Sequence, residues 1–95
     1  MKRQEPRQAV RTIKDRVKIN AFSITEYAFR GMVDQSVYDE DVQRAAATGR
    51  LLETRESATL GTCYILQGFA MNEEDILVVC RLLRQKVEVL DLSWA

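Results

Sequence analysis

The stretch that decides the fold is DEDVQRAAATGRLLET, residues 39–54, because the hydrophobic period changes inside it. Before Gly49, apolar residues recur at helical spacing, which predicts a helix over residues 40–48 with Asp39 as its N-cap. After Gly49, apolar and polar residues alternate as in a strand. We expect Gly49 to end the helix in the left-handed conformation that glycine adopts readily. The inward-facing residues of this helix are expected to be Val42, Ala45 and Ala46.

Downstream of this switch the period stays near two, which predicts a series of strands. We expect a tight turn at Arg84 and Gln85 and a polar loop at residues 71–75. The last strands are apolar on both faces, whereas an antiparallel sheet with one solvated face should alternate. The second face is therefore expected to be covered, by the N-terminal helix or by another chain. The predicted strands are residues 50–54, 62–69, 76–83 and 87–94.

Upstream of the switch the sequence predicts two more helices and a short strand. Helical spacing indicates a first helix over residues 7–17, and the alternation of residues 17–21 indicates a strand. A second helix follows with Ser23 or Thr25 as its N-cap, and residues 34–36 end it. Its inward-facing residues are expected to be Ala28, Phe29, Met32 and Val33.

The predicted order is helix, strand, helix, helix and then four strands, which indicates an α+β fold with helices packed on a mainly antiparallel sheet. The chain of 95 residues is 46% hydrophobic and 29% charged, as expected for one globular domain over residues 1–95, with residues 1–6 as a basic tail. No apolar run reaches the roughly 18 residues of a membrane-spanning helix, and no secretory signal is visible. We expect a cytoplasmic protein with no membrane partner.

The charge of the chain is unevenly distributed, although the net charge is zero. Residues 1–18 hold seven basic and two acidic residues, a balance of +5, so residues 19–95 carry −5. Such a basic segment either contacts phosphates, docks on its own domain or is a solvated helix face. The acidic remainder attracts RNA poorly without help from a partner.

Several kinds of chemistry are excluded by composition. The chain has no histidine, so Ser-His-Asp and Cys-His arrangements cannot form. Cys63 and Cys80 lie in strand-like runs and are expected to be reduced, buried thiols without a bridge. Two cysteines without histidine do not predict a metal site. The chain also has no glycine-rich phosphate-binding loop, so we expect no cofactor. The acidic run Glu73–Asp75 is expected to be a solvated loop.

Five runs of the chain occur in an order and spacing typical of a known family. They are FSITEYAFRGM at 22–32, DEDV at 39–42, GRLLE at 49–53, YILQG at 64–68 and ILVV at 76–79. Over residues 9–93 the chain resembles the small bacterial family known as domain of unknown function 4258. The resemblance implies a compact α+β fold. It also implies a toxin-like partner of a small antitoxin, comparable with RNA-cleaving interferases of the RelE kind.

The polar signature of that family is substituted in this chain. Tyr27 and Leu77 stand where the family usually has His, and Gly31 and Gln35 stand where it tends to have Arg. The apolar scaffold positions and glycines persist. If the polar residues carry an activity in the family, this chain lacks their groups.

The chemistry that remains is phosphate handling by arginine and tyrosine. Arginine can stabilise the charge that develops on a phosphorane while another group moves the protons. Arg81 is the most unusual candidate because it interrupts an apolar strand. The alternatives place Arg81 at a sheet edge with its stem packed and its head in water, and make Tyr27 a simple packing residue. The candidate catalytic residues are Arg81, Tyr27, Arg30 and Arg50, and Tyr64 is a further candidate.

Two functional hypotheses follow from these residues. In the first, the protein is toxin-like, acts on RNA and is held by a small antitoxin, and any nuclease activity of the isolated chain is weak. In the second, it is a non-catalytic module that dimerises or docks a partner through an apolar sheet face, with Trp94 or its neighbours near the contact. A large uncovered apolar patch usually marks an interface, and symmetric homodimers are the commonest solution.

Overall fold

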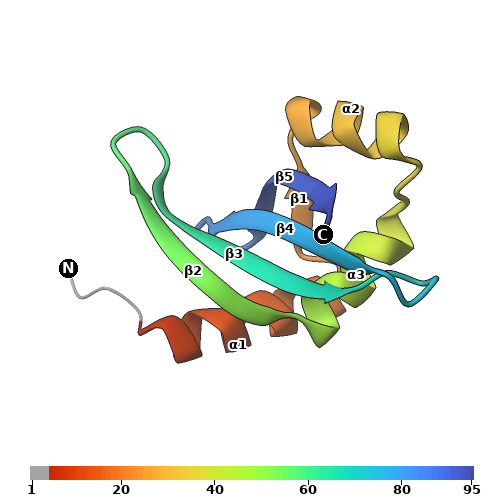
Figure 1. Cartoon of the computed structure of the whole chain (residues 1–95). Helices are drawn as coiled ribbons and strands as arrows, with labels where there is room; N and C mark the ends of the chain where they lie inside the picture. Colours follow the sequence, from red (N-terminus) through yellow and green to blue (C-terminus); the bar gives the residue numbers. More distant parts are fainter. Residues whose placement is uncertain (1–4) are drawn as a thin grey trace.

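Three helices pack against a five-stranded sheet within residues 5–95, the part of the chain that the computed structural model describes (Figure 1). The order of the elements is the predicted one, so the α+β fold is confirmed. The helices are α1 (Pro6–Lys18), α2 (Glu26–Gln35) and α3 (Asp39–Thr48). The strands are β1 (Phe22–Ile24), β2 (Arg50–Ser57), β3 (Gly61–Phe69), β4 (Asp75–Leu82) and β5 (Val87–Trp94).

The sheet has the order β1-β5-β4-β3-β2, in which β2 to β5 form an antiparallel meander and β1 runs parallel to β5. The turn between β4 and β5 is the predicted one at Arg84 and Gln85, since the amide of Leu83 donates to the carbonyl oxygen of Lys86 over 2.8 Å. Strand β4 lies at the centre of the sheet. The alternative that placed Arg81 at a sheet edge is therefore wrong.

The strand predicted at residues 17–21 is wrong in its position. Helix α1 continues to Lys18, and Val17 belongs to the buried stripe of that helix. The chain then turns at Asn20, which has a φ of 61°, and β1 begins at Phe22. The alternation of residues 17–21 fits a helix end as well as a strand, because so short a stretch cannot distinguish the helical period of 3.6 residues from the strand period of two.

All three helices lie on one face of the sheet, and α1 and α3 are seen beneath it in Figure 1. The expectation that α1 covers the second face is therefore wrong. One buried cluster joins α1 and α3 to β3, β4 and the start of β5, and the other joins α2 and α3 to β4 and the rest of β5. The first contains Ala9, Ile13, Val17, Ala46, Tyr64, Leu66, Cys80 and Val87. The second contains Ala28, Met32, Val37, Val42, Ala45, Ala70, Ile76, Val78, Val89 and Leu92.

Helix α2 buries a narrower stripe than the sequence predicts. Thr25 is the N-cap, and its hydroxyl oxygen accepts a hydrogen bond from the amide of Ala28 over 3.1 Å. Ala28 and Met32 face the core, but Phe29 and Val33 are exposed, so the prediction is wrong for these two. The reason is position, because α2 packs mainly on β5, near one end of the sheet.

Helix α3 begins one residue earlier than predicted, with Tyr38 rather than Asp39 as its N-cap. The buried carboxylate of Asp41 accepts from the amides of Tyr38 and Met71, each over 2.9 Å. It therefore ties the start of α3 to the loop between β3 and β4. The predicted inward residues Val42, Ala45 and Ala46 are all buried.

Two glycines let α3 lie directly on the sheet. Gly49 is extended, with a φ of −68°, so its predicted left-handed conformation is wrong. A Cβ on Gly49 would lie 2.6 Å from the carbonyl oxygen of Ala45, and a Cβ on Gly68 in β3 would overlap the same oxygen. The glycines are needed for close approach and not for an unusual backbone conformation.

The outer edge of β5 is closed by two different groups. Strand β1 pairs with Val87–Val89 only. Beyond it, the side-chain amide of Gln35 donates to the carbonyl oxygen of Leu92 over 3.2 Å and accepts from the amide of Trp94 over 3.4 Å. The Trp94 indole in turn donates to the backbone oxygen of Gln35 over 3.1 Å. Trp94, expected near a partner contact, is thus used inside the chain.

Candidate functional site

The four candidate catalytic residues do not converge on one site. Tyr27 and Arg30 lie on α2, whereas Arg50 begins β2 and Arg81 lies in β4. Arg50 and Arg81 share a sheet face but are two strands and four residues of register apart, roughly 16 Å between Cα atoms. None of the main cavities formed by residues 5–95 is lined by two of the four. Tyr64 is buried on the opposite face, beneath α1.

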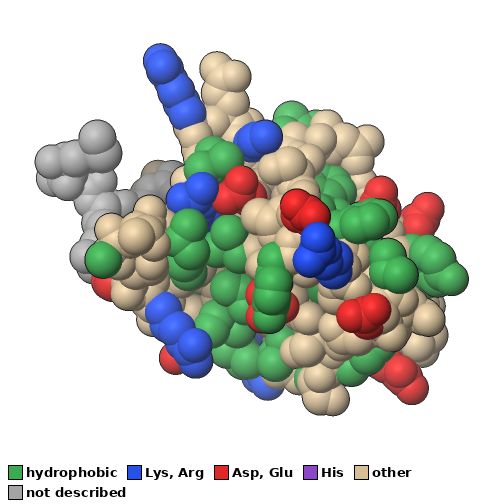
Figure 2. All heavy atoms as spheres, turned by 90° about the horizontal axis from the view of Figure 1, so that it is seen from above, with side chains coloured by type: hydrophobic (Ala, Val, Ile, Leu, Met, Phe, Trp, Pro, Cys, Tyr) green, Lys and Arg blue, Asp and Glu red, His purple; other side chains and the backbone are tan. Residues whose placement is uncertain are grey.

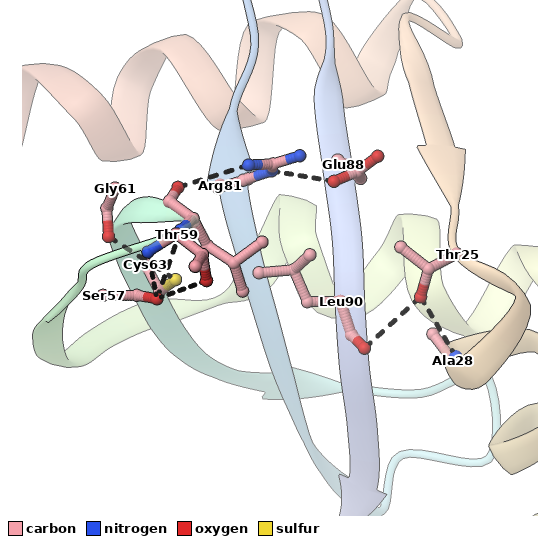
Figure 3. Close-up of polar contacts among 10 residues, drawn as sticks. Thr25, Ala28, Ser57, Thr59, Gly61, Cys63, Arg81, Glu88 and Leu90 are labelled. Atoms are coloured by element: carbon pink, nitrogen blue, oxygen red, sulfur yellow. Dashed lines mark hydrogen bonds and ion pairs between the residues drawn. The ribbon is translucent and has the colours of Figure 1, made fainter.

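Arg81 is engaged by groups of its own chain (Figure 3). Its Nε donates to Oε1 of Glu88 over 2.8 Å, and its Nη1 donates to the carbonyl oxygen of Leu60 over 3.4 Å. The side chains of Arg81 and Glu88 are only 24% and 21% exposed. The guanidinium therefore ties β4 to β5 and to the loop between β2 and β3, and its charge is already balanced by a carboxylate.

The two candidates on α2 are solvent-exposed. Arg30 pairs with Glu26 over 2.7 Å, one helical turn away, an arrangement that contributes only about 0.3–0.5 kcal/mol at a surface. Tyr27 is 71% exposed, so its alternative role as a packing residue is also wrong. Neither has the buried, convergent surroundings that usually perturb a catalytic group.

The sheet face away from the helices has a regular arrangement, which the strand register defines. We call it the open face. Its centre is apolar and its borders are charged, with three arginines and four carboxylates, the fourth being Asp75 opposite Phe69, so its formal charge is −1. Its rows across β2, β3, β4 and β5 are Arg55–Cys63–Arg81–Glu88, Glu53–Ile65–Val79–Asp91 and Arg50–Gln67–Leu77–Ser93.

The open face is shallow and partly apolar. No helix covers it, yet Ile65, which lies between Glu53 and Val79 in the register, is only 8% exposed. Leu77 and Val79 are half-buried and line a depression of about 260 Å³. Seen from above the view of Figure 1, hydrophobic side chains gather on the side of the molecule away from α1 and α3 (Figure 2). Arg55 bonds to Glu53 over 2.8 Å at its border.

A second apolar surface lies between α2 and the start of α3, and the sequence analysis missed it. We call it the α2–α3 groove. Its volume is about 500 Å³. Phe29 and Val33, predicted to be core residues, belong to it, and the signal in the sequence is the wide arc of apolar residues on α2, wider than one contact with a sheet can bury. The groove is lined by Phe29, Met32, Val33, Ser36, Val37, Tyr38, Asp39 and Glu40.

The two cysteines occupy opposite faces of adjacent strands. Tyr64 opposes Cys80 on the helix-covered face, so Cys63, the next residue in β3, points to the open face. A bond between the two sulfur atoms would require the strands to rearrange. Burial, and to a smaller extent the neighbouring Cys63, raises the pKa of the Cys80 thiol to about 12. Cys80 therefore stays protonated and is a poor nucleophile.

Other site chemistry is limited in the described part of the chain. Residues 5–95 contain no group of three or more His, Cys, Asp or Glu side chains placed to hold a metal ion. No helix described here has both the length and the apolar character needed to cross a membrane.

Comparison with models of known families, with curated proteins and with solved structures finds no match for this chain. The family resemblance carried by the five sequence runs therefore stays a prediction.

Proposed function

We propose that this protein is a non-catalytic protein-binding module that pairs with a second copy of itself through the open face. The observation that carries the proposal is the one-sided placement of the helices. It leaves Leu77 and Val79 half-buried at the centre of a sheet with no cover of its own. Apolar sheet faces in soluble proteins are normally packed against another layer.

The charges of the open face support a second copy as that layer. In a symmetric dimer the same surface meets itself, so it must be self-complementary. Three arginines and four carboxylates border the apolar centre, so each copy offers both signs of charge to the other. A nucleic acid, in contrast, requires a surplus of positive charge.

The side chains of the open face also argue for protein rather than RNA. Sheets that bind single-stranded RNA stack bases on aromatic side chains at their centre. The register places Ile65, Val79 and Leu77 at the centre of this face. The one aromatic that the described strands place on it is Phe69, at the end of β3.

Sedimentation velocity over a range of protein concentrations tests the proposal. We expect the intact chain to shift from monomer to dimer as the concentration rises to high micromolar values. Val79→Lys should remain monomeric, because it places a charge at the centre of the open face. Val33→Lys is the matched control, since it makes the same change on α2 and should still dimerise.

A monomer at every concentration would overturn the proposal, and so would a dimer that Val33→Lys dissociates and Val79→Lys does not. Thermal unfolding shows whether each variant is folded. If Val79→Lys does not fold, Leu77→Lys makes the same test one row away on the same face.

RNA cleavage remains the second candidate, and one observation favours it. Arg50, Arg55 and Arg81 all belong to the open face, which could align them along a phosphate backbone. Expression in a bacterial host tests this function. Growth arrest with mRNA cleavage, abolished by Arg50→Ala in a protein that still folds, would favour it over the binding module.

A further inference from the structure

The α2–α3 groove combines a buried apolar floor with exposed apolar walls. Met32 and Val37 form the floor and are each only 4% exposed. The walls include Phe29, Val33 and Tyr38, which are 56%, 63% and 67% exposed. Three large apolar side chains in one groove are a continuous patch, which on a soluble protein commonly marks a binding site.

The spacing of the apolar residues suits a helical ligand. Phe29, Met32 and Val33 occupy positions i, i+3 and i+4 of α2, so they form a stripe along the helix axis. A stripe of this kind beside a groove accommodates the apolar face of a second helix that lies along it.

The charge around the groove is one-sided. Its lining includes two carboxylates and no basic side chain, and Arg30, the arginine of α2, is paired with Glu26. Asp39 and Glu40 line the groove and form no ion pair with any residue in the described range. Acidic residues in the first turn of α3 are favoured by its helix dipole. That effect accounts for the carboxylates but not for the exposed Val33 and Tyr38 beside them.

From this combination we infer that the α2–α3 groove binds a basic amphipathic helix of another protein. The apolar face of the ligand helix covers Phe29, Val33 and Tyr38, and its lysines or arginines approach Asp39 and Glu40. This site is separate from the open face, and the inference does not depend on dimerisation.

A second copy of this chain does not supply that helix. Its own basic amphipathic helix is α1, whose apolar residues Ala9, Ile13 and Val17 are completely or almost completely buried in its own core. Presenting them to the groove of another molecule would require α1 to leave the sheet. The occupant therefore comes from a different protein.

Fluorescence anisotropy with designed peptides tests the inference on the intact chain. The probe is a labelled amphipathic helix made of leucine and lysine, and two comparison peptides carry glutamate in place of lysine or the same composition in scrambled order. We expect the lysine helix to bind at least about tenfold more tightly than either comparison peptide, and to bind more weakly as salt rises.

Variants locate the binding site. Val33→Lys should weaken binding of the lysine helix by about tenfold or more, and Glu40→Gln by about threefold. Ile19→Lys is the matched control, because Ile19 is exposed and lies outside both surfaces, and it should bind like the original chain. If either variant in the groove is poorly folded by circular dichroism, Tyr38→Ser repeats the test at a third position.

Four results would overturn the inference. They are equal binding of the lysine and glutamate helices, equal binding of the scrambled peptide, equal weakening by Val33→Lys and Ile19→Lys, and no binding at high micromolar concentration. Dissociation of a dimer by Val33→Lys would also overturn it, because the groove would then be an interface between copies. Failure of Val79→Lys to dissociate the dimer bears only on the open face.

Discussion

Val78 and Val79 are neighbours in β4, yet they lie on two very different faces of the sheet. Val78 is 1% exposed and belongs to a cluster that α2 and α3 close from one side. Val79 points to the open face, beside Ile65 and opposite Asp91, where no helix covers it. The same residue type thus has two kinds of neighbour, which are side chains of the chain's own helices on one face and charged side chains and solvent on the other.

This comparison explains what an apolar run in a strand can indicate. The run ILVV predicts correctly that both faces of β4 are apolar, but it does not tell which face is covered by the chain itself. Side chains on the two faces should therefore also differ in how much they contribute to the free energy of unfolding.

Gly68→Ala should be the most destabilising single change. It adds a methyl group on the helix-covered face, where it would overlap the carbonyl oxygen of Ala45, so α3 must move away from the sheet. We expect a loss of about 3 kcal/mol in the free energy of unfolding, measured by urea denaturation. The control is Gly31→Ala on α2, where the nearest atom lies 3.5 Å away and the helix should gain up to about 1 kcal/mol. Equal stability of Gly68→Ala and the original chain would mean that α3 does not pack on β3.

The pair Val78→Ala and Val79→Ala makes the comparison directly. Val78→Ala should cost about 2 kcal/mol, because it leaves a cavity between the helices and the sheet. Val79→Ala should cost less than about 1 kcal/mol in the monomer, because solvent and neighbouring side chains fill the space. Urea denaturation at low protein concentration measures both. Equal losses would show that the open face is packed as tightly as the helix-covered face.

The ion pair of Arg81 and Glu88 gives a smaller effect. A double-mutant cycle with Arg81→Ala and Glu88→Ala should give a coupling of about 1 kcal/mol, because both groups are largely shielded from water. The same cycle for Arg30 and Glu26 should give about 0.3–0.5 kcal/mol, because that pair is exposed. Thermal or urea unfolding of the original chain, the two single variants and the double variant of each cycle measures the coupling energies. A coupling energy near zero for Arg81 and Glu88 would mean that this ion pair does not stabilise the fold.

The raised pKa of the Cys80 thiol predicts a small loss of stability in alkaline solution. Burial raises the pKa of its thiol in the folded chain from 9.0 to about 12, so the unfolded chain loses this proton first as the pH rises. The stabilisation is complete below pH 9 and is lost progressively between about pH 9 and pH 12. At pH 9.5 the loss should be about 0.8 kcal/mol. Urea denaturation at pH 8 and pH 9.5 measures the fall in the free energy of unfolding between the two pH values. This fall should be smaller by the same amount in Cys80→Ala than in the original chain, and an equal fall in both proteins would contradict the prediction.

The parts of the fold that the sequence predicts well are those with a long, clear period. Strands β3 and β4 contain runs of consecutive apolar residues, β5 largely alternates apolar and polar residues, and the small residues Ala45 and Ala46 mark the packed side of α3. The predictions fail where the outcome depends on the third dimension. Whether Phe29 packs inward depends on how far α2 lies from the centre of the sheet, and no local pattern contains that distance.

The candidate site was harder to predict for a related reason. An arginine within an apolar strand is unusual, which is why the sequence singles out Arg81. Its meaning depends on Glu88, which lies directly opposite in β5 and is seven residues away in the sequence. Strand register decides whether the two meet, and a bulge in β5 shifts that register by one residue.

The amide of Gln35 has a consequence for how copies of this protein can add to one another. An open-ended fibre built by strand addition needs two free edges on every molecule, one to receive a neighbour and one to offer to the next. Here the β5 side is closed by three residues of β1 and by the Gln35 side chain, which leaves β2 as the long edge. Joining through β2 therefore stops at two molecules. One glutamine side chain thus makes this sheet a terminating unit instead of a repeating one.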